Sequence, residues 1–121
     1  MSTFTKPLKL EYIDGKEWKL TNAFVYYTDL PVKYKAFTIP SGFITDFATI
    51  PKILCFVFDR FGKYGKAAVL HDYLYSQCPV SRDTADDMFL EAMKVLGVNK
   101  TRRYLIYFAV RLFGKKHYCK K

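Results

Sequence analysis

The chain has 121 residues, enough for one domain that buries most of its apolar surface without disulfides or metals. Half of the residues are hydrophobic, and only six Gly and five Pro interrupt the chain, which excludes a disordered or low-complexity protein. Twenty Lys and Arg against eleven Asp and Glu give a net charge of +9, which favours polyanionic partners such as nucleic acid, anionic lipid or an acidic protein surface.

The three cysteines, Cys55, Cys78 and Cys119, show no CxxC pair and no Cys/His spacing typical of a zinc site. We therefore expect reduced, mostly buried thiols rather than a disulfide framework. The chain does not begin with a basic segment followed by an apolar stretch, and its most apolar stretch, residues 104–113, is too short to cross a bilayer. Neither a signal peptide nor a transmembrane segment is expected.

The first forty residues predict an antiparallel strand meander. The expected strands are residues 8–13, 18–27 and 32–39, which alternate or are rich in β-branched and aromatic side chains. The turn pair Asp14-Gly15 separates the first two strands. Residues 43–50 are expected to form a loop that leads to Pro51, a residue suited to the first turn of a helix.

The sequence from residue 51 to residue 114 predicts about four helices. The expected helices are residues 52–61, residues 64–76, a third that Ser81 caps and Gly97 ends, and a last helix in the basic C-terminal segment. Apolar residues of the third helix recur without a gap at helical spacing. We therefore expect a single α+β domain over residues 1–121, with the meander at 1–40, the helical part at 51–114 and a basic tail at 115–121.

The third helix carries two adjacent carboxylates that face different ways. At about 100° per residue, Asp86 borders the apolar stripe, whereas Asp87 points nearly opposite, toward water. A buried acid needs a partner, and the basic inward group on the preceding helix is His71. The short connection between the two helices makes them antiparallel neighbours. We predict a His71–Asp86 pair at the floor of an accessible cleft.

Such a pair is suited to proton transfer. The unperturbed pKa of an imidazole is about 6.5, and a carboxylate on its far nitrogen fixes its tautomer. Tyr75, one helical turn after His71, can bond the same carboxylate, while Asp72 points along another edge and can ligate a hard cation. The structural alternatives are a core histidine bonded to a backbone carbonyl and an Asp86 stabilised by the helix N-terminus. Together these residues favour a catalytic dyad of His71 and Asp86, supported by Tyr75.

Residues 67–93 resemble the active-site helices of phospholipase A2-like proteins, above all the short, disulfide-free form found in parvovirus capsid proteins. In that form an HDxxY helix is followed by a helix that starts with ADxxF. This chain reads HDYLY at residues 71–75 and ADDMF at residues 85–89. The resembling segment, residues 67–93, covers about a quarter of the chain.

The resemblance implies a role for each matching residue. His71 would be the general base that activates a water, and Asp86 would hold its other nitrogen. Tyr75 would bond Asp86, and Asp72 would ligate Ca²⁺. The Gly-rich calcium loop that precedes the His helix in phospholipases has no counterpart here, so Asp72 with one or two carbonyls would bind calcium weakly.

A larger part of the chain resembles a family of small, uncharacterised phage and prophage proteins. The residues that carry this likeness are 37–51, 71–75, 82–89 and 107–114. The resemblance implies a viral source, with the bacterial host cytoplasm or the virion as the location. It also makes Asp46 a candidate metal ligand, because its loop can fold over the His71 helix. The alternative role of Asp46 is an Asx-type bond that caps the helix near Pro51.

The positive charge is concentrated near the C-terminus. The candidate residues for binding an anionic surface are Lys100, Arg102, Arg103, Arg111, Lys115 and Lys116. A solvated helix and tail without a specific ligand is the alternative for this segment.

Three functions fit the sequence. The first is a His-Asp hydrolase, with phospholipase A2-like ester hydrolysis at an anionic lipid surface. The second is a non-catalytic virion or assembly component that docks on other viral proteins through a basic, aromatic surface. The third is a nucleic-acid-binding phage protein, which the charge and the aromatic residues support.

Overall fold

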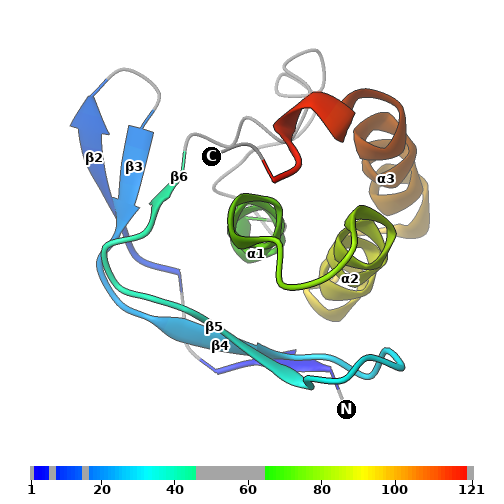
Figure 1. Ribbon diagram of the computed structural model, residues 1–121, viewed down its shortest axis with the longest axis horizontal. Helices are drawn as coiled ribbons and strands as arrows, with labels where there is room; N and C mark the ends of the chain where they lie inside the picture. The colour runs from blue at the N-terminus through cyan, green and yellow to red at the C-terminus, as the bar shows by residue number, and fades with distance from the viewer. Residues whose placement is uncertain (1, 6–7, 15–16, 46–64, 120–121) are drawn as a thin grey trace.

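The computed structural model describes residues 2–5, 8–14, 17–45 and 65–119, and these residues form a single small α+β domain. Two small antiparallel sheets lie beside a group of three α-helices (Figure 1). The predicted fold class is confirmed. The helix predicted at residues 52–61 lies outside the described residues, so the described part holds three of the four expected helices.

The strands differ from the single meander that the sequence predicts. They are β1 (Thr3–Phe4), β2 (Leu10–Asp14), β3 (Glu17–Leu20), β4 (Phe24–Tyr27), β5 (Ala36–Ile39) and β6 (Ile44–Thr45). One sheet has the order β1-β4-β5 and the other the order β2-β3-β6, and all pairs are antiparallel. The chain therefore passes back and forth between two sheets.

The predicted strand at residues 18–27 is broken in two. At the break, the Thr21 amide donates a hydrogen bond to the Lys9 carbonyl, and the chain then turns away from β3. As a result β3 and β4 belong to different sheets. The predicted strand at residues 32–39 is reduced to β5, which is no longer than its partner β4. Ile44 and Thr45, expected in a loop, instead pair with β3.

The helices are α1 (Gly65–Gln77), α2 (Arg82–Val95) and α3 (Lys100–Phe113), and a short 3-10 turn, η2 (Lys115–His117), follows them. Ser81 accepts a hydrogen bond from the Thr84 amide at 3.2 Å, which confirms it as the N-cap of α2. Asn99 caps α3 in the same way, accepting from the Arg102 amide at 2.9 Å. These caps fix where α2 and α3 begin.

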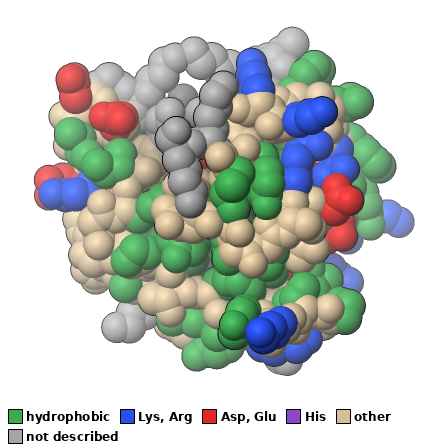
Figure 2. Space-filling view, viewed as in Figure 1, with side chains coloured by type: hydrophobic (Ala, Val, Ile, Leu, Met, Phe, Trp, Pro, Cys, Tyr) green, Lys and Arg blue, Asp and Glu red, His purple; other side chains and the backbone are tan. Residues whose placement is uncertain are grey.

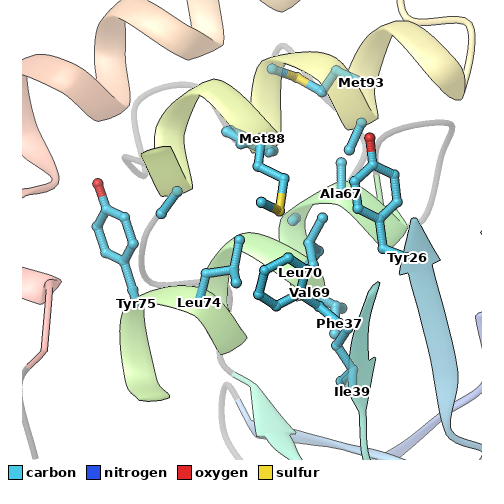
Figure 3. Close-up of a cluster of buried hydrophobic side chains, with 14 of the residues drawn as sticks. Tyr26, Phe37, Ile39, Ala67, Val69, Leu70, Leu74, Tyr75, Met88 and Met93 are labelled. Atoms are coloured by element: carbon cyan, nitrogen blue, oxygen red, sulfur yellow. The ribbon is translucent and has the colours of Figure 1, made fainter. Parts of the chain in front are cut away.

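Helix α1 lies at the centre of the described fold. In Figure 1 it lies beside helix α2, with β6 on its other side, and the sheet that contains β4 and β5 runs below both helices. Figure 3 shows Phe37 and Ile39 of β5 on one side of Leu70 of α1, while Met88 of α2 approaches from the other side. Tyr26 of β4 lies beside Ala67 of α1 and points toward α2. Because α1 is covered by both neighbours, side chains on most of its circumference are buried.

The segment after α3 folds back onto the end of α1. The Cys119 amide donates a hydrogen bond to the Tyr75 carbonyl at 2.7 Å, and the Tyr118 hydroxyl donates to the Val80 carbonyl. Cys78 and Cys119 form a disulfide, so the expectation of reduced thiols is wrong for these two cysteines. They are 41 residues apart in sequence, and only the return of the chain brings them together. Cys55 lies outside the described residues.

Candidate functional site

His71 of α1 and Asp86 of α2 are in direct contact. The distance from His71 Nε2 to Asp86 Oδ1 is 2.7 Å, and both side chains are fully buried. Helical periodicity predicted this pair, and the structure confirms the contact. Asp87, predicted to face water, is exposed and accepts a hydrogen bond from the Tyr107 hydroxyl at 2.9 Å.

The Asp86 carboxylate is the centre of the site. Its Oδ1 also accepts a hydrogen bond from the Tyr75 hydroxyl at 2.6 Å, and its Oδ2 accepts one from Arg111 Nη1 at 2.7 Å. The Arg82 guanidinium adds a more distant ion pair, with 3.9 Å between Nε and Oδ2. Burial by itself raises the pKa of the Asp86 carboxyl, but the hydrogen bonds from His71, Tyr75 and Arg111 outweigh burial and lower this pKa below its ordinary value. Asp86 is therefore ionised at neutral pH.

When the His71 imidazole carries a single proton, an ionised Asp86 sets its tautomer. A carboxylate only accepts hydrogen bonds, so Nε2 carries the proton and Nδ1 presents a lone pair. Among the described residues, no hydrogen-bond partner reaches the buried Nδ1 atom. Buried polar atoms are nearly always paired, and an unpaired one calls for an explanation such as a bound water or a catalytic role. Nδ1 is therefore the atom of this site that is available to accept a hydrogen bond or a proton from a bound molecule.

Aromatic rings enclose the imidazole. The centroid of the His71 ring lies 4.2 Å from that of Tyr75 and 4.5 Å from that of Phe89. The prediction that His71 lies in an accessible cleft is wrong, because the His71 side chain has no exposed surface. Helical periodicity shows which side of α1 the residue faces, but it does not show how deeply α1 is buried.

Tyr75 is held in place from two sides. Its hydroxyl donates to Asp86 and accepts a hydrogen bond from Arg82 Nε at 3.2 Å. Burial, together with the hydrogen bond to Asp86, raises the pKa of the Tyr75 phenol well above its ordinary value. Tyr75 therefore stays protonated and acts as a hydrogen-bond donor at neutral pH.

Two arginines complete the site, and the sequence did not assign either of them to it. Arg82 Nη2 donates to the Val110 and Arg111 carbonyls at 2.8 and 2.7 Å, near the end of α3. Arg111 Nη2 also pairs with Asp83 at 2.7 Å. Arg111 was expected to bind an external anionic surface, but its guanidinium instead holds two carboxylates of α2. The spacing of Arg82 and Asp86, four residues apart on one helix, was the local signal for the first arginine.

Asp72, the candidate calcium ligand, is almost fully buried on α1 and accepts a hydrogen bond from the Thr45 hydroxyl. Asp46, the other candidate ligand, lies outside the described residues. Within the described part of the chain, no three His, Cys, Asp or Glu side chains are grouped so that they could hold a metal ion. Of the two candidate ligands, the described residues therefore include only Asp72, and one carboxylate does not make a calcium site.

The remaining basic candidates lie on α3 and η2. The side chains of Lys100, Arg102, Lys115 and Lys116 are exposed, whereas Arg103 is partly buried and donates from Nη1 to the Val98 carbonyl at 3.2 Å. Four of the six predicted residues therefore face solvent freely. Over the residues that the structure describes, no helix has both the length and the apolar character needed to span a membrane.

Comparison with known protein families gives one result. A family model described as "Protein of unknown function (DUF1353)" matches residues 18–110. This range contains His71, Tyr75, Asp86 and all of α1 and α2. No curated protein and no solved structure matches the chain.

Proposed function

Because the chain belongs to the DUF1353 family, whose function is unknown, we propose its function from its own side chains: a hydrolase in which His71 is the general base. The observation that carries this proposal is a buried imidazole whose Nε2 is bound by Asp86 and whose Nδ1 has no hydrogen-bond partner in the part of the chain that the structure describes. A purely structural histidine would gain stability by pairing both nitrogens, because an unsatisfied buried acceptor costs about 1–3 kcal/mol.

The proposed reaction is the hydrolysis of an ester. A water molecule donates a hydrogen bond to His71 Nδ1, loses a proton to it and attacks the ester carbonyl carbon. The charge on the resulting imidazolium is balanced by Asp86 across Nε2. The proton then passes from Nδ1 to the leaving alkoxide as the carbon–oxygen bond breaks, which restores the neutral imidazole.

The other residues of the site act on Asp86. Arg111 and Tyr75 hold the two carboxylate oxygens and keep the group ionised, so that it orients His71 rather than taking its proton. We propose a phospholipid ester as the substrate, because the HDxxY and ADxxF motifs resemble those of phospholipase A2-like proteins and the chain is strongly basic. Calcium dependence stays a prediction of that resemblance alone.

Fatty-acid release from vesicles of phosphatidylcholine and phosphatidylglycerol tests the proposal. The wild-type protein should release fatty acid, and the His71→Gln variant should lose at least about 100-fold in rate. His117→Gln is the matched control, because it removes the other of the two histidines, on η2, and should leave the rate unchanged. Parallel reactions with calcium and with a chelator test the role of the ion. A folded wild-type protein without hydrolysis, or an active His71→Gln variant, would contradict the proposal.

The burial of His71 requires a path for the reactants, and this path can be measured. Diethyl pyrocarbonate modifies accessible unprotonated imidazoles, and mass spectrometry locates the modification. We expect fast modification of His117 and slower modification of His71, with loss of activity following the slower reaction. If His71 is never modified in the folded protein, water and substrate do not reach it, and the hydrolase proposal fails.

A second candidate function is a non-catalytic virion or assembly component. The observation that favours it is the complete burial of His71 and Asp86 within a network that joins three helices. In that case His71→Gln would lower stability without abolishing any activity. Unchanged incorporation of this variant into particles, with no hydrolysis by the wild type, would support the assembly role.

A further inference from the structure

Helix α3 is apolar on two opposite sides. On the inner side, Ile106 and Val110 are fully buried against the rest of the protein. On the outer side, the exposed fractions are 50% for Leu105, 57% for Phe108 and 75% for Leu112. These three residues recur at i, i+3 and i+7, so they form one stripe along the helix.

Tyr104 extends this surface at the start of the helix, whereas Phe113 is an exposed ring at its C-terminal end, on another side. Tyr104 and Phe113 are also exposed, and the Tyr104 and Phe108 rings lie 6.2 Å apart. We call the surface formed by Tyr104, Leu105, Phe108 and Leu112 the outer stripe. An exposed apolar patch of this kind on a small domain indicates an interaction site.

Basic side chains border the outer stripe. Lys100 and Arg102 are exposed at the start of α3, and Lys115 and Lys116 are exposed on η2, just beyond its end. Residues 100–121 contain eight Lys or Arg and no Asp or Glu, and of these cations Arg111 is paired with Asp83 and Asp86 of α2. Figure 2 shows hydrophobic side chains together with Lys and Arg, and some acidic side chains, on the side of the molecule where α3 lies. The surface therefore combines exposed apolar area with a strong positive potential.

We propose that the outer stripe and its basic border bind the surface of an anionic lipid bilayer, with α3 lying in the plane of the interface. A bilayer interface offers an apolar interior and anionic phosphates in one plane, which matches an apolar stripe edged with cations. This binding site is separate from the His71 site and does not depend on hydrolysis.

Charge argues against a second copy of the chain as the occupant, and the aliphatic residues argue against nucleic acid. A second copy of the chain would present the same cationic border, and the two borders would repel each other. Nucleic acid would satisfy the cations and could stack on the aromatic rings, but Leu105 and Leu112 would gain nothing from its phosphates and polar base edges. The high exposed fraction of the aliphatic Leu112 side chain therefore favours lipid over nucleic acid as the occupant.

Vesicle sedimentation tests the proposal. The wild-type protein should bind vesicles of phosphatidylcholine and phosphatidylglycerol, bind pure phosphatidylcholine weakly, and dissociate as the salt concentration rises. The Phe108→Ser/Leu112→Ser variant keeps the charge and should bind at least about tenfold more weakly. Lys115→Gln/Lys116→Gln should weaken binding to the anionic vesicles only.

Two controls separate this site from the rest of the molecule. Tyr34→Ser removes another exposed aromatic side chain, far from α3 in sequence, and should leave binding unchanged. His71→Gln should also bind normally, so failure of the hydrolase proposal and failure of this one are distinguishable.

Three results would overturn the proposal. The first is equal binding to neutral and anionic vesicles, or no binding at low salt. The second is binding by Phe108→Ser/Leu112→Ser as tight as that of the wild type. The third is a concentration-dependent dimer, or a complex with duplex DNA, that this variant abolishes while vesicle binding of the wild type is absent.

Discussion

Arg111 of α3 reaches across to Asp86 of α2, and 2.7 Å separates Nη1 from Oδ2. Since Asp86 also holds His71 and Tyr75 of α1, one buried carboxylate connects all three helices of the described fold. The same contacts of Asp86 therefore shape the site and hold the three helices together, and a substitution of Asp86 should affect both.

Replacing Asp86 by Asn should lower the free energy of unfolding by about 3 kcal/mol at pH 7, because it leaves the charge of Arg111 without its buried partner. The folded-state pKa of Asp86 is lowered, so its stabilising contribution is complete above the unfolded pKa of about 3.9 and is lost as the pH falls through the lower folded value. Urea unfolding of the wild type between pH 7 and pH 2 should therefore show an acid decline that Asp86→Asn reduces.

The matched control for this change is Asp87→Asn, on the next residue of α2. Asp87 is exposed and accepts one hydrogen bond, from Tyr107. Its replacement should leave the acid decline as it is in the wild type. An equal acid decline in Asp86→Asn would show that Asp86 is not ionised in the folded protein.

Replacing Tyr75 by Phe should destabilise the protein by about 2 kcal/mol, because it removes a hydrogen bond to a charged, buried acceptor. The raised pKa of Tyr75 should also disappear from a spectrophotometric titration of the tyrosines at high pH. Tyr73→Phe, two residues earlier on α1, serves as the control, and its effect on stability should be smaller. Comparable losses in both variants would mean that the bond to Asp86 contributes little.

Gly114 allows α3 to end against Tyr75. A Cβ atom at this position would lie 2.5 Å from the Val110 carbonyl oxygen and 3.0 Å from the Tyr75 hydroxyl oxygen. Gly114→Ala should therefore cost about 1–3 kcal/mol in thermal or urea unfolding, as overpacking does elsewhere. The added methyl also meets the Tyr75 hydroxyl, so the loss in the Gly114→Ala/Tyr75→Phe double variant should be smaller than the sum of the single losses. If the stability losses of the two single variants add exactly in the double variant, the methyl group at position 114 does not interact with the Tyr75 hydroxyl.

The disulfide between Cys78 and Cys119 should stabilise the protein by about 4 kcal/mol, the value that loop-closure entropy gives for a loop of this size. Unfolding in the presence of a reducing agent should show this loss in the wild type. The Cys78→Ser/Cys119→Ser variant should be destabilised to the same extent and should not respond to the reducing agent. Equal stability of the wild type with and without the reducing agent would contradict the prediction that this disulfide stabilises the protein.

Helical periodicity was enough to predict the contacts of His71, Asp86 and Tyr75, because these residues lie on two helices joined by a short connection. The role of Arg111 could not be read in the same way, since it depends on how α3 crosses α2. The disulfide between Cys78 and Cys119 could not be predicted for a related reason, since the chain returns to Cys78 only after α3.

The strands were the less predictable part of the fold. Alternation of side chains continues through residues 18–27, so it gives no sign that the chain leaves one sheet at Thr21 and enters another at Phe24. Strand partners are chosen by contacts between distant residues, such as Trp18 with Thr45. A local pattern indicates that a segment is extended but does not identify its neighbour.

The double-sided character of α3 has a practical consequence for handling the protein. In dilute buffer, the net charge of +9 makes the molecules repel one another, and this repulsion offsets association through the exposed apolar residues of the outer stripe. Concentrated salt shields that repulsion and strengthens apolar association at the same time. Purified material should consequently precipitate on salting, and mild ionic strength with a nonionic detergent is the condition in which it should remain monodisperse.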